Sequence, residues 1–156
     1  MKKTAFLIRL KAERKLELVE PSEEIRKAYI EKSESNLISA KILLENSMLE
    51  ESVTLAYYSM YHSLASLLFK TGIKSENHTA SIILLKEIFG IDNSEIFFAK
   101  KERVDKQYYV SFSITKEQVK DAIKRAEIFN SKMLDFLSKL NNEDIILFRK
   151  KFMEIC

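Results

Sequence analysis

The pattern of apolar and polar positions is most informative between residues 52 and 69. These eighteen positions, SVTLAYYSMYHSLASLLF, carry no formal charge, although 31% of the chain is Asp, Glu, Lys or Arg. Half of them are Ser, Thr, Tyr or His, which is too polar for a lipid-facing helix. A helix without a charged face must be covered nearly all round. The pattern therefore predicts a helix at the middle of a bundle, in a subunit interface, or both.

A line of small side chains runs along this predicted helix: Ser52, Ala56, Ser59, Ser63 and Ser66. Small residues at this spacing let a neighbouring helix approach closely. We expect Ser59 and Ser63 to pack against another helix, either within the chain or across a homodimer axis. Tyr58 and His62 lie one turn apart on a different stripe, and we interpret His62 as a core imidazole that hydrogen-bonds to a tyrosine or to the backbone.

Apolar residues recur at helical spacing in five further segments, 22–45, 75–90, 92–109, 115–140 and 143–156. Gly72 and Gly90 are placed to end the central helix and the helix after it, and VSFSI (110–114) is expected to be a short extended link. The pattern predicts an all-α protein, an antiparallel up-and-down bundle of four to five main helices. Helix start signals stand at Ser22, at Ser47 with Glu50, at Ser75, at Asp92 with Glu95, and at Thr115 with Gln118.

The two ends of the chain follow weaker patterns. Residues 1–20 are ambiguous, because KLELVE alternates as a strand does, and EDIILFRKKFMEIC (143–156) is typical of a short amphipathic helix. We therefore divide the chain into an N-terminal arm (1–21), a helical bundle (22–140) and a short C-terminal helix (141–156). Both ends are expected to be loosely attached.

Composition narrows the class of protein further. The chain has 156 residues, which makes one domain the default, and its 2 Gly and 1 Pro are too few for a sheet-rich fold with many tight turns. The single cysteine, Cys156, excludes an intrachain disulfide and fits the cytoplasm. In MKKTAFLIRLKAER, Arg9 and Lys11 interrupt the apolar run, so we expect neither a signal peptide nor a membrane anchor. The net charge of +3 permits contact with nucleic acid without requiring it.

Few residues suggest catalysis. His62 and His78 are the only histidines and lie on different predicted helices, so neither a metal nor a cofactor is expected. Two segments remain candidates for chemistry. In TGIKSENH (71–78), Lys74 lies close to His78, which either faces a groove or caps a helix. The other, KKERVDKQYYV (100–110), suits phosphate binding and base stacking, or is a solvated basic face; its candidate residues are Lys100, Arg103, Lys106, Gln107, Tyr108 and Tyr109.

Several motifs, in order and in register with the predicted helices, resemble the HEPN domain family. They are SESNLISAKILLENSMLEESV, LAYYSMYHSLASLLFKTGIKSENH, and ERVDKQYYV followed by TKEQVKDAIKRAEIF, within residues 22–140. The similarity is to the small stand-alone prokaryotic branch. It implies a bundle that usually dimerises and binds RNA or nucleotides. It also implies a minimal nucleotidyltransferase as partner, often in a two-component, toxin–antitoxin module.

The chain departs from that family at its nuclease motif, in which an Arg is followed, after four to six residues, by a His. Arg103 matches the arginine, but Tyr108 stands where the histidine would be, and no histidine follows it. Tyr108 cannot serve as a general base near neutral pH, because the pKa of tyrosine is about 10. In the nuclease branch a tyrosine near the catalytic histidine can be modified with nucleotides; Tyr108 and Tyr109 lie near that place at a different offset.

Three functions remain open. The first is a non-catalytic module that binds RNA or nucleotide phosphates through Arg103 and its neighbours and works with a nucleotidyltransferase. The second is a metal-independent ribonuclease in which a substitute replaces the missing histidine, and the third is a structural bundle that holds another protein. On a helix, Lys100 and Lys106 would share one face with Arg103. We expect the Arg103 guanidinium to lie in water, so that Arg103→Ala weakens binding and leaves stability nearly unchanged.

Overall fold

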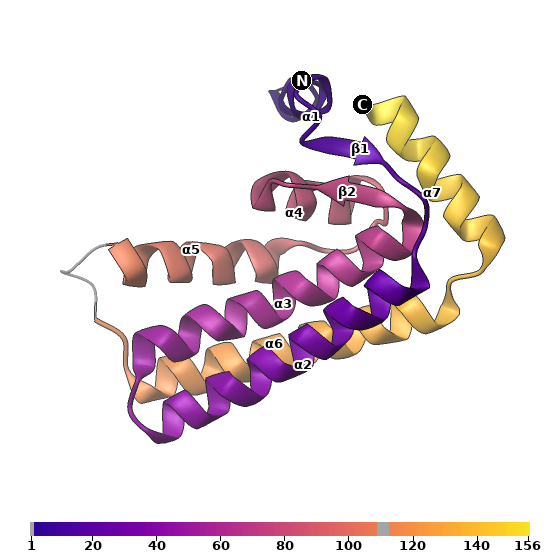
Figure 1. Ribbon diagram of the computed structural model, residues 1–156. Helices are drawn as coiled ribbons and strands as arrows, with labels where there is room; N and C mark the ends of the chain where they lie inside the picture. The colour runs from indigo at the N-terminus through magenta and orange to yellow at the C-terminus, as the bar shows by residue number, and fades with distance from the viewer. Residues whose placement is uncertain (1, 109–112) are drawn as a thin grey trace.

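The computed structural model describes residues 2–108 and 113–156, with the backbone alone for 104–108. Figure 1 shows α2, α3 and α6 running side by side, with α5 on the opposite side of α3. The predicted all-α bundle is confirmed. In chain order the elements are α1 (Lys2–Ala12), β1 (Leu16–Leu18), α2 (Glu23–Glu45), α3 (Leu49–Thr71), β2 (Ile73–Ser75), α4 (His78–Glu87), α5 (Ser94–Tyr108), α6 (Lys116–Lys139) and α7 (Asn142–Ile155).

Helix α3 is the centre of the bundle, as its uncharged sequence predicts. It contacts α2, α4, α5, α6 and α7, and 13 of its 23 residues are buried. The line of small residues belongs to that buried set, which lets the backbones of neighbouring helices come close to α3. At its C-terminal end, Gly72 takes the left-handed conformation (φ 74°) that ends the helix, as predicted.

Local chemistry explains two helix starts that the sequence predicts. The Oγ of Ser22 accepts a hydrogen bond from a backbone N–H in the first turn of α2 at 3.1 Å. Thr115 and Gln118 form the reciprocal capping box at the start of α6. Each cap satisfies backbone N–H groups that have no partner within the helix.

Three other predicted start signals are wrong. No side chain caps α3, and Ser47 lies in the preceding turn with φ 57°. Asn77, rather than Ser75, caps α4, because Ser75 is the last residue of β2. Helix α5 begins at Ser94, and the carboxylate of Asp92 accepts a hydrogen bond from the Ser94 hydroxyl at 2.6 Å instead of forming a capping box.

The ends of the chain pack firmly against the bundle, so the prediction of loose attachment is wrong. Strand β1 pairs with β2 in antiparallel register, with Leu16 opposite Ser75. Leu7 of α1, Leu16 and Phe152 of α7 are all buried in the same core as α3. Figure 1 shows α1 and the C-terminal end of α7 close together, and the Lys11 ammonium donates to the Cys156 carbonyl at 3.1 Å.

A single arginine ties α7 to the end of α3. The Nη1 of Arg149 donates to the backbone carbonyls of Val19, Thr71 and Gly72, at 2.7, 3.1 and 3.1 Å. These carbonyls follow β1 or end α3, where a helix leaves acceptors without partners. The guanidinium therefore joins three segments that are distant in sequence.

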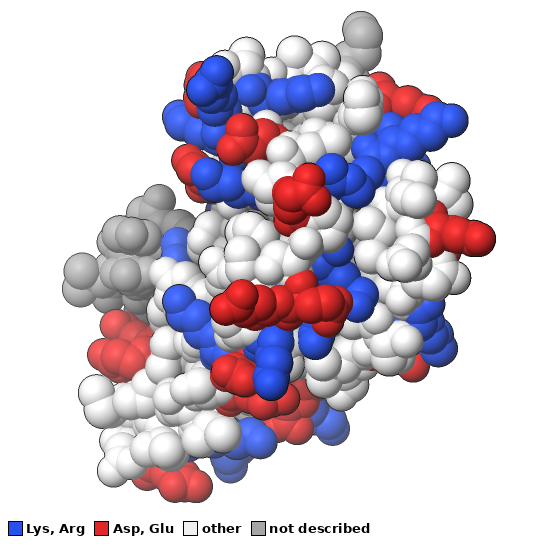
Figure 2. All heavy atoms as spheres, turned by 45° about the vertical axis from the view of Figure 1, so that its right-hand side comes forward, with Lys and Arg blue, Asp and Glu red and all other residues white. Residues whose placement is uncertain are grey.

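On the face shown in Figure 2, basic and acidic side chains are interspersed among uncharged ones. Within residues 2–108 and 113–156, no helix combines the length and the apolar composition needed to cross a membrane. Most of the extended link predicted at 110–114 lies outside the described residues.

Candidate functional site

Aromatic side chains of α2, α3 and α4 gather beside the first residue of α4. We name this group the aromatic cluster. Tyr57 and Tyr61 lie one turn apart on α3 and both reach His78: the Tyr57 hydroxyl is 2.8 Å from the His78 Nδ1, and the Tyr61 ring stacks on the imidazole at 3.7 Å. His78 thus faces the interior of the site. The members of the cluster are Tyr29, Tyr57, Tyr58, Tyr61, His62 and His78.

Arg103 of α5 lies against this cluster. Its guanidinium carbon is 5.3 Å from the ring centre of Tyr57 and 5.3 Å from that of Tyr58, and its Nη1 donates to the Tyr58 hydroxyl at 2.7 Å. The Nε is buried, and no hydrogen-bond acceptor for it is found among the described residues. The expectation that this head group lies in water is wrong, because the two rings cover part of it.

Burial keeps the cluster uncharged near neutral pH. Burial is the largest cause that lowers the pKa of His78 to about 4, and the positive charges of Arg103 and Lys100 add to it. Burial is also the largest cause that lowers the pKa of His62 to about 4, with smaller electrostatic contributions from Lys32 and His78. The pKa of the Tyr57 phenol is raised, chiefly by burial. Arg103 is therefore a cation set among neutral rings and hydroxyls.

Among the described residues, His62 forms no hydrogen bond to a tyrosine or to the backbone, so that prediction is not confirmed there. It is half-buried, and its ring stacks between Tyr29, at 5.7 Å, and Tyr58, at 6.1 Å. Its Nδ1 lies 3.4 Å from the Nδ2 of Asn36. The imidazole therefore forms part of an aromatic stack that links α2 to α3.

The basic residues predicted for the site are only partly brought together. Lys100 is close enough to lower the pKa of His78. Lys74 lies on β2 and pairs with Glu17 at 3.8 Å and with Glu76 at 3.4 Å. The side chains of Lys106, Gln107 and Tyr108 are not described, and Tyr109 lies outside the described residues, so their roles stay predictions.

Ser59 and Ser63 belong to a buried polar network inside a single chain. Ser59 and Ser33 each donate to the other's backbone carbonyl, at 2.8 and 2.7 Å. The amide of Asn130 donates to the Ser59 hydroxyl at 2.8 Å and accepts from the Ser63 hydroxyl at 2.9 Å. Because α2 and α6 already cover both serines, their position gives no support to packing across a homodimer axis. The homodimer itself stays a prediction.

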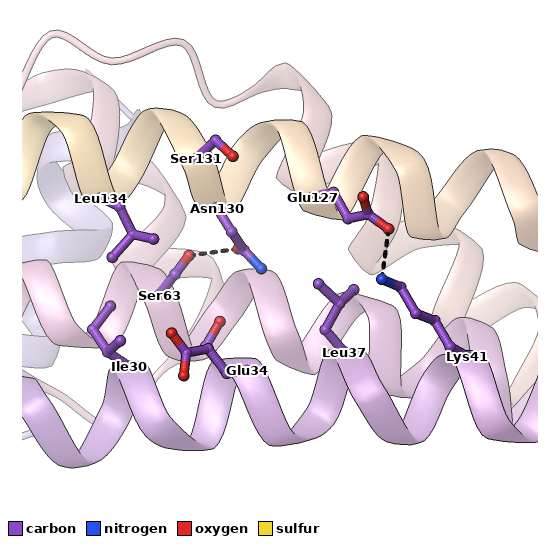
Figure 3. A pocket seen from close by; sticks show the side chains of 10 residues that line it. Ile30, Glu34, Leu37, Lys41, Ser63, Glu127, Asn130, Ser131 and Leu134 are labelled. Carbon is purple, nitrogen blue, oxygen red and sulfur yellow. Dashed lines mark hydrogen bonds and ion pairs between the residues drawn. The ribbon is translucent and has the colours of Figure 1, made fainter.

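This network forms the floor of a hollow of about 250 Å³ between α2 and α6. Figure 3 shows Asn130 bonded to Ser63 at the floor, and the ion pair of Lys41 with Glu127, 3.1 Å long, joining the two helices at one end. The amide and hydroxyls of the floor bond to one another and to the backbone. We therefore interpret this hollow as a packing seam rather than as a ligand site.

Sequence reasoning did not single out Tyr57 and Tyr61 as site residues. Their spacing of four residues, on the helix that also carries Tyr58 and His62, places aromatic rings over two turns of one helix. That repetition was the available signal. In the structure the rings of Tyr57 and Tyr58 pack against the Arg103 guanidinium, and a cation beside aromatic rings can hold a phosphate and stack a base. Elsewhere in the described chain, no three His, Cys, Asp or Glu side chains converge as metal ligands would.

Comparison with known proteins agrees with the fold. The model of the HEPN domain matches residues 26–136. A protein of Methanocaldococcus jannaschii named "Putative toxin MJ0605" is 30% identical over 125 residues, which cover 76% of this chain and 92% of that protein. "UPF0332 protein PH1297" of Pyrococcus horikoshii is 43% identical over 60 residues, 38% of this chain and 42% of that protein. Because the domain match spans more than half of the chain, the chain belongs to the HEPN domain family.

Proposed function

We propose that this HEPN protein binds the phosphates of RNA or nucleotides at Arg103 and does not cleave them. The observation that carries the proposal is the setting of the Arg103 guanidinium. Two tyrosine rings pack against it and the Tyr58 hydroxyl accepts from its Nη1 at 2.7 Å, so the guanidinium is held in one place while the residue stays partly exposed. A phosphate oxygen is a strong acceptor that an arginine can bind with two parallel hydrogen bonds.

The chemistry of the nearest imidazole favours binding over cleavage. A ribonuclease needs a group that gives a proton to the leaving oxygen. With a pKa of about 4, His78 would be protonated in roughly one molecule in a thousand at pH 7. Its Nδ1 is also occupied by the Tyr57 hydroxyl. A metal-independent ribonuclease remains the second candidate, because His78 lies beside the arginine that matches the nuclease motif.

We further propose that the protein works in a two-component module of the toxin–antitoxin kind, with a minimal nucleotidyltransferase as partner and as a homodimer itself. The name of the Methanocaldococcus jannaschii relative contains the word toxin, and this supports the proposal of a toxin–antitoxin module. The partner and the dimer rest on the family resemblance. Purification of the native protein with its bound partners tests this part, and recovery of no nucleotidyltransferase would count against it.

A titration of labelled RNA, followed by fluorescence anisotropy at two salt concentrations, tests the phosphate site. Arg103→Ala should weaken binding and reduce the dependence of affinity on salt, as the loss of a phosphate contact does. Arg125→Ala is the matched control, because Arg125 is an exposed arginine on α6 that pairs with Asp121 at 2.7 Å. Equal affinities for wild type and Arg103→Ala would remove Arg103 from the site.

Because Arg103 is half-buried, its replacement also removes the hydrogen bond to Tyr58. Thermal melting of both variants identifies the temperature range in which Arg103→Ala is folded, and binding is compared within it. Gel analysis of the same RNA separates the two candidate functions. Cleavage by the wild type that Arg103→Ala or His78→Gln abolishes would establish the ribonuclease instead.

A further inference from the structure

A second hollow, of about 220 Å³, lies between α2, α3, β2 and the start of α4. It is smaller than the roughly 300–1,000 Å³ of pockets that enclose a whole drug-sized ligand. It therefore suits one flat ring system better than an entire nucleotide. The exposed Glu76 lies among its lining residues, so the hollow reaches the surface there.

Two stacked pairs of rings line this hollow. Tyr29 and Phe69 are 5.4 Å apart and inclined by 7°, and Tyr61 and His78 are 3.7 Å apart and inclined by 15°. The four rings come from α2, α3 and α4 and all belong to the lining. Aromatic faces of this kind stack nucleobases in proteins that bind single-stranded nucleic acid.

The polar end of the hollow has the opposite charge to Arg103. The Glu76 carboxylate pairs with Lys74 at 3.4 Å, and the side chain of Glu76 is 52% exposed. A carboxylate repels a phosphate but accepts hydrogen bonds from the amino group of a base, as Asp and Glu do from N4 of cytosine. The hollow therefore favours the amino-bearing ring of a nucleotide and excludes its phosphate.

His78 connects the hollow to the phosphate site. One face of its imidazole stacks on Tyr61 in the lining, its Nδ1 meets the Tyr57 hydroxyl, and the charge of Arg103 lowers its pKa. We propose that the hollow binds a nucleobase carrying an amino group, with the phosphate of the same or the next nucleotide at Arg103. This inference rests on the proposed phosphate site, because it assigns the base of the same ligand to the neighbouring hollow.

Calorimetric titration with matched probes tests the base site. Cytidine and uridine monophosphates differ where cytosine has an amino group and uracil a carbonyl, so the wild type should bind the cytidine nucleotide roughly tenfold more tightly. Glu76→Ala removes the accepting oxygens at an exposed position and should remove that preference while the fold stays intact. Phe69→Leu keeps an apolar side chain but removes one aromatic ring, so it should weaken the binding of both nucleotides.

Ribose 5-phosphate separates the two sites, because it has a phosphate and no base. Its binding should depend on Arg103 and not on Glu76 or Phe69. If it binds while the two nucleotides bind equally and Phe69→Leu has no effect, the base site is overturned and the phosphate site stands. If neither ribose 5-phosphate nor RNA binds, the proposed function fails. If a preference for cytidine persists in Glu76→Ala, the Glu76 carboxylate does not accept a hydrogen bond from the amino group.

Discussion

At the scale of single residues, burial changes the acid–base behaviour of both histidines. The pKa of His62 and that of His78 are each lowered to about 4, whereas an unfolded chain has the ordinary value of about 6.5. Between about pH 6.5 and pH 4 the unfolded chain therefore binds more protons than the folded protein. The free energy of unfolding falls as the pH is lowered through this window, on the order of 1–3 kcal/mol for each histidine.

Urea denaturation at pH 7 and at pH 5 measures this effect. His78→Gln keeps a polar side chain but removes one titrating group, so the variant should lose less stability than the wild type between the two pH values. The hydrogen bond from Lys70 lowers the pKa of the Glu23 carboxyl, so the stability that this carboxylate contributes is lost mainly at a more acidic pH than that of the histidines. Equal losses for the two proteins would show that His78 is not responsible.

Asn130 is the residue on which the buried polar network depends. Its amide bonds to the buried hydroxyls of Ser59 and Ser63. Asn130→Ala should lower the free energy of unfolding by about 2 kcal/mol, because the loss leaves a void and removes two buried hydrogen bonds. Ser131→Ala, at the exposed neighbouring position on α6, should change it by less than about 0.5 kcal/mol. Similar values for the two variants in urea denaturation would contradict this role.

At the scale of elements, the junction between α3 and β2 requires glycine for two reasons. Gly72 has φ 74°, and a Cβ there would meet the carbonyl of Val19 and the Nη1 of Arg149. Gly90, after α4, has a similar φ of 68°, but a Cβ there would meet no atom within 4 Å. A side chain at Gly90 would therefore strain only the left-handed backbone, whereas a side chain at Gly72 would also crowd its neighbours.

Alanine substitutions at these positions form a matched pair. Gly90→Ala should lower the free energy of unfolding by about 1 kcal/mol, since only the backbone conformation is strained. Gly72→Ala should lower it by more than about 2 kcal/mol, because the backbone of the segment that follows β1, at Val19 and Pro21, and the Arg149 side chain must also move. Equal losses measured by urea denaturation would show that the junction can relax around a side chain.

At the scale of the whole molecule, the proposed homodimer needs an uncovered apolar surface. Helix α5, which also carries Arg103, presents Phe97 and Phe98, which are 36% and 46% exposed. Aromatic residues are enriched in the buried centres of protein interfaces. The family resemblance implies a dimer, and this exposed pair is the contact that we expect it to use.

Light scattering at tens of micromolar tests the dimer. The wild type should show twice the 18.2 kDa mass of the chain. Phe98→Ser should shift the mass towards the monomer, whereas Ile146→Ser, which changes a side chain that is 66% exposed on α7, should not. A wild type that stays monomeric would contradict the homodimer.

The helices, the central place of α3 and the caps at Ser22 and Thr115 could all be read from the sequence. Each depends on residues within about one helical turn of one another: on the period of apolar positions, on a hydroxyl three residues before an N–H group, or on a glycine at a helix end. The uncharged stretch at 52–69 also predicts its own central place, because no position in it is charged and the helix therefore has no charged face to turn to solvent.

The site depends on contacts between residues far apart in the chain. Tyr58 and Arg103 are 45 positions apart, and Tyr57 and His78 are 21 apart, so no local pattern brings these pairs together. Serine is a common helix cap, but Ser75 pairs with Leu16 and is therefore part of a strand. Asn77 caps α4 instead. The partial burial of Arg103 has the same origin: a charged side chain is expected in water until packing of α5 against α3 sets two rings against it.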